Sequence, residues 1–89
     1  PNSITHLTFD WFFNQQVDNL PISVSHLTFC GEFGQSVDNL PNSIIQLTFG
    51  YSFNQQVNNL PISVTQIELG KYQLKLIKKI PFNCEIQIK

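Results

Sequence analysis

Charged residues are scarce in this sequence, and the positively charged ones are confined to one end. Charged side chains make up 12% of the 89 residues, about half of the usual quarter, so Asn, Gln, Ser and Thr must cover much of the surface. Residues 1–60 contain no Lys or Arg, and all five lysines lie in the last nineteen residues. A nucleic-acid-binding surface needs a basic face interleaved with aromatic residues. We therefore expect no nucleic-acid partner and interpret the lysine-bearing end as a solvated cap.

Several other signals of function are missing as well. No apolar run approaches the roughly eighteen residues that span a bilayer, and there is no charged-then-apolar leader, so we expect no membrane partner. There is no Gly-rich phosphate loop, and no spacing of Ser, His and Asp implies a nucleophile with a base behind it. We therefore expect no enzymatic activity and no cofactor. The chain begins at Pro1 rather than at Met, and we expect it to be a piece of a longer protein or a processed product.

What the sequence does contain is a repeat of twenty residues. Its period is marked, without an insertion, by Pro1, Pro21, Pro41, Pro61 and Pro81. Self-similarity at a fixed period of this size is typical of a solenoid, in which each repeat is one coil that stacks on its neighbours to bury its apolar face. We expect a single domain, with three regular repeats over residues 1–60 and a divergent repeat with a capping strand over residues 61–89.

Each coil is predicted to hold one short strand and an irregular return. Counted from the proline, positions 4, 7, 9, 13, 17 and 20 are apolar in all three regular coils. Positions 7 and 9 alternate with polar positions 6 and 8, which is the period of a strand with one buried face. A return of about sixteen residues makes neighbouring strands parallel. The return is too short and too rich in Asn, Gln and Pro for a helix, and we predict irregular or 3₁₀ turns on the convex side. The fold class is therefore mainly β, a parallel β-solenoid.

Side chains at equivalent positions should lie one above another along this solenoid. We expect a column of Phe13, Phe33 and Phe53, with Asn14 and Asn54 tying their turns to the next coil. In the divergent coil, five residues are expected to supply the core, namely Leu69, Leu74, Leu76, Ile77 and Ile80. The last strand is expected to alternate Cys84, Ile86 and Ile88.

The letters of the repeat resemble those of a known family. The pattern L-P-x-S-[IV]-x-x-L-T-F, then F-N-Q, then V-x-N-L-P, over residues 1 to about 70, resembles the FNIP repeat of large DNA viruses of amoebae and of social amoebae. Phe13-Asn14-Gln15-Gln16 stands where the family has Phe-Asn-Ile-Pro, and the second coil has Gly34 in place of the Asn. The family is similar to leucine-rich repeats, which implies a leucine-rich-repeat-like solenoid. Members often carry an F-box ahead of the repeats, which implies a substrate receptor of a ubiquitin ligase, although these residues contain no F-box.

The exposed strand face and the turns after it form the candidate binding surface. Positions 10 to 12 vary most between coils and carry Trp11, Tyr51 and Tyr72. Such residues supply large contact areas at protein interfaces. We predict a protein partner that binds to His6, Thr8, Asp10, Trp11, Phe12, His26, Thr28, Glu32, Gln46, Tyr51 and Tyr72.

Alternatives to this interpretation stay open. His6 and His26 share a column and could hold a metal with Asp10, but a His and Gln ladder is more often a plain polar surface, and we predict no metal. Trp11 and Phe12 could instead cover a ragged edge of the core. The alternative function is a structural or assembly protein that stacks through an uncapped N-terminal end.

The two cysteines, Cys30 and Cys84, bear on the compartment. They belong to the second and fifth coils, so we expect their Cα atoms to lie farther apart than the limit of about 7 Å for a disulfide. We expect both thiols to be reduced and the protein to be cytoplasmic, in the host cell if it is viral.

Overall fold

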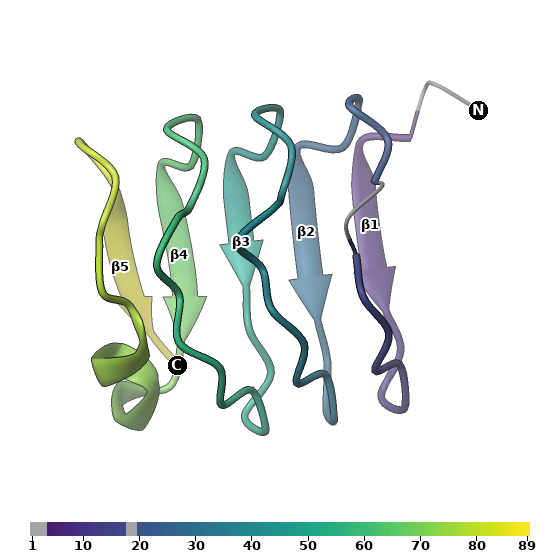
Figure 1. The fold of residues 1–89 in the computed structure, drawn as a ribbon, viewed down its shortest axis with the longest axis vertical. Coiled ribbons are helices and arrows are strands. Elements are labelled where there is room, and N and C mark those ends of the chain that lie inside the picture. The colour runs from purple at the N-terminus through teal and green to yellow at the C-terminus, as the bar shows by residue number, and fades with distance from the viewer. Residues whose placement is uncertain (1–3, 18–19) are drawn as a thin grey trace.

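The chain winds into a solenoid around one parallel sheet. The computed structural model describes residues 4–17 and 20–89. The five strands follow one another across the sheet in chain order, and every neighbouring pair is parallel (Figure 1). The strands are β1 (His6–Phe9), β2 (His26–Phe29), β3 (Gln46–Thr48), β4 (Gln66–Leu69) and β5 (Glu85–Ile88). The predicted parallel β-solenoid is confirmed.

The returns between strands are irregular over their described residues, and the divergent coil contains a 3₁₀ helix, both as predicted. There the 3₁₀ helix η1 (Lys71–Leu76) follows β4 and lies at the same end of the sheet as the chain's last residue (Figure 1). Within residues 4–17 and 20–89, no helix is both long and apolar enough to cross a membrane.

The strand register follows the twenty-residue period up to β4 and then shifts. His6 pairs with His26, and Gln46 pairs with Gln66. Between β4 and β5 the offset is nineteen residues, with Gln66 opposite Glu85. The turn before β5 contains Asn83, whose φ of 63° is left-handed, a conformation that Asn tolerates better than most residues. The prolines therefore keep their period to Pro81, while the segment between Pro81 and β5 is one residue shorter than its equivalents in the other coils.

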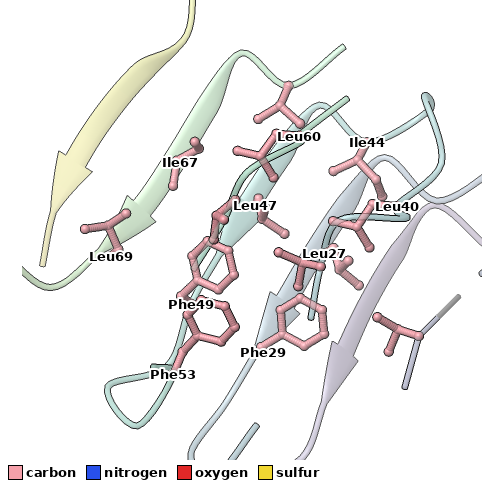
Figure 2. Close-up of a cluster of buried hydrophobic side chains, with 14 of the residues drawn as sticks. Leu27, Phe29, Leu40, Ile44, Leu47, Phe49, Phe53, Leu60, Ile67 and Leu69 are labelled. Carbon is pink, nitrogen blue, oxygen red and sulfur yellow. The ribbon is translucent and has the colours of Figure 1, made fainter. Parts of the chain in front are cut away.

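Two parallel columns of phenylalanine form the centre of the core. Phe13, Phe33 and Phe53 stack with ring centroids 6.0 and 6.1 Å apart, as predicted. A second column of Phe9, Phe29 and Phe49 runs beside it, with separations of 5.4 and 6.1 Å. Within each coil the two rings lie 3.9–4.3 Å apart. Figure 2 shows one such pair, Phe49 and Phe53, with the buried leucines of the strands beside it. Stacking therefore buries rings that a single coil would leave exposed.

Hydrogen bonds from serine side chains to the preceding coil supplement the sheet. The hydroxyls of Ser23, Ser43 and Ser63 donate to the carbonyls of Ile4, Val24 and Ile44 at 2.5, 2.7 and 2.6 Å. This serine column was not predicted.

The predicted tie by Asn14 is confirmed, because its Oδ1 accepts a hydrogen bond from the amide of Gly34 at 2.9 Å. Asn54 is exposed. Its coil is tied to the next by Gln73, which donates to the carbonyl of Phe53 at 3.0 Å.

Gln73 ends the phenylalanine column in the divergent coil. It stands at the position of Phe13, Phe33 and Phe53, and it is 7% exposed. Its Nε2 donates to the carbonyls of Gly50 and Phe53 at 2.7 and 3.0 Å, and its Oε1 accepts from the amide of Gly70 at 2.8 Å. A buried amide with its polar atoms paired is well tolerated.

The expectation that five apolar residues supply the core of the divergent coil is wrong for two of them. Leu69 and Leu76 are buried and Ile77 packs partly against the core, but Leu74 and Ile80 are exposed. Leu74 lies on the outer side of η1, while Gln73 takes the inner position. Of the residues expected to alternate in the last strand, Cys84 lies just before β5 and packs against the core with Ile86, whereas Ile88 is 48% exposed.

Candidate functional site

The predicted binding residues lie on two adjoining surfaces. Five occupy outward-facing strand positions, namely His6, Thr8, His26, Thr28 and Gln46. The other six lie in the turns that directly follow β1 to β4, namely Asp10, Trp11, Phe12, Glu32, Tyr51 and Tyr72. Those turns form one edge of the sheet (Figure 1). We call the solvent-facing residues of these four turns the rim. They are Asp10, Trp11, Phe12, Glu32, Tyr51, Ser52, Lys71 and Tyr72.

The strand face is polar and contains a pair of stacked histidines. The rings of His6 and His26 lie 4.1 Å apart at an interplanar angle of 10°. Their Nδ1 atoms share hydrogen bonds with the hydroxyls of Thr5 and Ser25, at 3.0 and 2.8 Å. Over the described part of the chain, no three His, Cys, Asp or Glu residues are grouped to hold a metal. The alternative in which Asp10 joins the two histidines therefore has no geometric support.

The rim turns share one backbone hydrogen bond. In each turn the amide of position 13 donates to the carbonyl of position 10. The donor and acceptor pairs are Phe13 and Asp10 at 3.2 Å, Phe33 and Cys30 at 3.4 Å, Phe53 and Gly50 at 3.2 Å, and Gln73 and Gly70 at 2.9 Å. The donor residue, partly buried at Phe13 and buried in the other three turns, fixes each turn to the core. The residues between can therefore vary without altering the scaffold.

The aromatic side chains on this scaffold are exposed. Trp11 is 58% exposed, Phe12 77%, Tyr51 73% and Tyr72 81%. Side chains that leave this much surface in water contribute little to the core, so a role limited to covering its edge does not fit Phe12, Tyr51 or Tyr72. They leave aromatic surface available for contact in the first, third and fourth rim turns.

Trp11 is the exception, since one side of its ring is packed. A Cβ atom on Gly31 would lie 2.4 Å from Cδ2 of Trp11, and Gly31 has a φ of +50°, which favours glycine. The carbonyl of Trp11 also accepts a hydrogen bond from the amide of Glu32 at 2.8 Å. The ring therefore rests against the next coil in a fixed orientation, with its other side in solvent.

Charge changes sign along the rim. The acidic residues Asp10 and Glu32 lie in the first two turns, and Lys71 lies in the fourth. Lys89, which follows β5, reaches back to the third turn, and its Nζ lies 4.5 Å from the centroid of the Tyr51 ring. Sequence analysis missed Lys89 because its place beside Tyr51 depends on the stacking of three coils.

The two thiols are separated in the sheet and show no sign of a reactive site. Cys30 follows β2 and Cys84 precedes β5, with β3 and β4 between them, and both are free. Burial, and to a smaller degree the charge of Glu85, raises the pKa of the Cys84 thiol. This thiol therefore stays protonated at neutral pH, and a protonated thiol is a poor nucleophile.

The fold and the rim define a class of protein, a parallel β-solenoid built from short repeats with a variable edge. The chain belongs to the FNIP repeat family, because residues 1–31 and 33–72 match that family, described as FNIP Repeat. The predicted resemblance is confirmed. The family indicates a repeat module of the protein-interaction type, and it is typically non-catalytic. We found no match among curated proteins or among solved structures.

Proposed function

We propose that this solenoid binds a protein partner through the rim, with the strand face at the border of the contact. The observation that carries the proposal is the exposure of four large aromatic side chains along a single edge, on turns that are each closed by the same backbone hydrogen bond. Trp and Tyr are enriched among the residues that dominate binding energy. Because the turns are already fixed, little ordering of the backbone opposes binding.

The test is affinity capture from cell lysate with a Trp11→Ala/Tyr51→Ala variant. We expect recovery of the partner to fall at least about tenfold, since residues of this kind each contribute about 2 kcal/mol or more to binding. An Ile22→Ala/Ile62→Ala variant is the matched control, because these side chains are 83% and 88% exposed and lie in the turns before the strands. Recovery of the same partners in the same amounts by both variants would show that the rim is not the binding surface.

A substrate-receptor role in a ubiquitin ligase is the narrower form of this proposal, and the family resemblance supports it. In this form the rim partner is a substrate. We expect it to be ubiquitinated in cells that express the protein, and less so in cells that express the Trp11→Ala/Tyr51→Ala variant. We place this event inside the cell, the host cell if the protein is viral, in keeping with the two free thiols. Equal ubiquitination with both proteins would contradict the receptor role.

Assembly through the N-terminal end is a second candidate, favoured by one observation. Leu7, Phe9 and Phe13 are only partly buried, whereas their equivalents in the second coil, Leu27, Phe29 and Phe33, are 1% exposed. The open end of the two phenylalanine columns can therefore stack on another coil.

The solution mass of the 89-residue chain, measured over a range of concentrations, separates the two candidates. Stacking between copies predicts a mass that rises with concentration and stays at the monomer value for Phe13→Asp. A wild-type chain that remains monomeric at the highest concentration would contradict assembly between copies.

A further inference from the structure

A hollow of about 500 Å³ lies at the C-terminal end of the rim. It is lined by Tyr51, Gly70, Lys71, Tyr72, Gln73 and Lys89. The lining residues come from the third turn, from the start of η1 and from the end of β5. They meet because the amide of Lys89 donates to the carbonyl of Leu69 at 2.8 Å, which holds the end of β5 against the end of β4.

Two lysines give the hollow a positive charge, and each is placed over an aromatic ring. Lys89 Nζ lies 4.5 Å from the centroid of Tyr51 and donates a hydrogen bond to the carbonyl of Phe49. Lys71 Nζ lies 5.3 Å from the centroid of Tyr72. Contact with a ring face is favourable for a cation. No Asp or Glu side chain is among the lining residues, and the acidic residues of the rim belong to the first two turns.

The remaining walls leave space and flat surfaces for a ligand. A Cβ atom on Gly70 would lie in contact with the Tyr51 ring, at 3.5 Å. Because glycine has no Cβ, this part of the ring is left open to a ligand. The Gln73 amide is fully engaged with Gly50, Phe53 and Gly70 and is fixed in place. The rings of Tyr51 and Tyr72 are largely exposed.

We propose that this hollow receives a carboxylate side chain of the partner, with a neighbouring aromatic residue of the partner on the tyrosine rings. The inference rests on the proposed function, because it takes the ligand to be a protein segment that lies along the rim. A carboxylate matches the charge of Lys71 and Lys89, and a ring matches the flat walls.

The opposite end of the rim then sets the direction of the bound segment. The first and fourth turns are three strand spacings apart, a distance of about 14 Å. An extended peptide covers this distance in about four residues. The acidic residue of the partner lies at the hollow. A basic residue about four positions away faces Asp10 and Glu32.

The test is an NMR titration of the ¹⁵N-labelled 89-residue chain with two peptides, acetyl-Glu-Phe-Glu-amide and acetyl-Gln-Phe-Gln-amide. We expect the acidic peptide to shift the amide signals of Gly70, Lys71 and Tyr72, and the neutral peptide to bind about fivefold more weakly. Raising NaCl to about 1 M should remove most of the difference, because charges on the surface are then screened beyond about 3 Å.

Two variants of equal charge sharpen the result. Lys71→Gln/Lys89→Gln should abolish the preference for the acidic peptide, while Lys78→Gln/Lys79→Gln should keep it, since these two lysines do not line the hollow. Equal binding of both peptides to the wild-type chain, or an equal loss in the two variants, would overturn the inference.

The peptide titration and the capture experiment test the carboxylate site and the proposed function separately. Capture that depends on Trp11 and Tyr51, together with equal binding of the two peptides, would remove the carboxylate site and leave the proposed function standing. A carboxylate preference at the hollow, together with capture that is indifferent to the rim, would remove the proposed function.

Discussion

Phe33→Ala is expected to lower the free energy of unfolding by about 3–5 kcal/mol. Phe33 is 1% exposed, and its ring lies 3.9 Å from Phe29, 6.0 Å from Phe13 and 6.1 Å from Phe53. Truncation removes the ring contacts with the coils on both sides. It also leaves a cavity, which the neighbouring coils cannot close because the sheet holds them in place. The loss is a large share of the total stability of a domain this small, which we expect to be about 4–13 kcal/mol.

Chemical denaturation followed by circular dichroism measures this effect, and Phe12→Ala is its matched control. Phe12 is 77% exposed, and its truncation should change the free energy of unfolding by less than about 0.5 kcal/mol. If the two variants lose the same stability, the assignment of Phe33 to the core and of Phe12 to the rim is wrong.

Gln73→Ala is expected to cost about 2–4 kcal/mol. The substitution removes the Gln73 partner of the Phe53 carbonyl and of the Gly70 amide, and one of the two donors to the Gly50 carbonyl, which keeps the amide of Phe53 at 3.2 Å. A buried polar group that loses its partner retains the cost of its desolvation. Part of that cost is recovered where water enters the space left by the side chain.

Two further substitutions isolate the hydrogen bonds of Gln73 from its volume. Gln73→Leu keeps most of the volume without the amide and should still be destabilised. Gln87→Ala, at an exposed position of β5, should unfold at nearly the wild-type denaturant concentration. A Gln73→Leu protein as stable as the wild type would mean that packing, not the amide, terminates the phenylalanine column.

The elements that could be predicted from the sequence are those whose residues recur at the same positions in several coils. Leu27 and Phe29 recur in three coils at the same positions, so their alternation defined the strands, and the period defined the parallel order. The same logic placed Phe13, Phe33 and Phe53 in one column, because only stacking explains why a buried aromatic recurs every twenty residues.

The features that could not be predicted occur in only one coil or involve a residue type that gives no distinctive signal. The shift at β5 occurs only once, because Gln66 pairs with Glu85 at an offset of nineteen residues although Pro81 keeps the expected period. Gln73 stands where the other coils have Phe, and nothing local indicates that its amide pairs with three backbone groups. Leu74 is of a residue type common in the core, but its position in η1 places its side chain on the outer side of the helix.

The candidate site was predictable in part for the same reason. Trp11, Tyr51 and Tyr72 were selected because they vary on a constant scaffold, and the structure places all three on one edge. The hollow was missed because Lys89 lies far from Tyr51 in the sequence and meets it only after β5 has paired with β4. A signal could have been sought in the lysines of the last coil, which we interpreted only as a solvated cap.

Equivalent residues of successive coils lie one above another, and this stacking places the aromatic residues of the first, third and fourth turns on one rim. Nuclear Overhauser effects between aromatic protons test it directly. The account predicts contacts between Phe13 and Phe33 and between Phe33 and Phe53, whose centroids are 6.0 and 6.1 Å apart, and no contact between Phe13 and Phe53. A contact between Phe13 and Phe53, or none between either neighbouring pair, would contradict the stacked coils and the rim that depends on them.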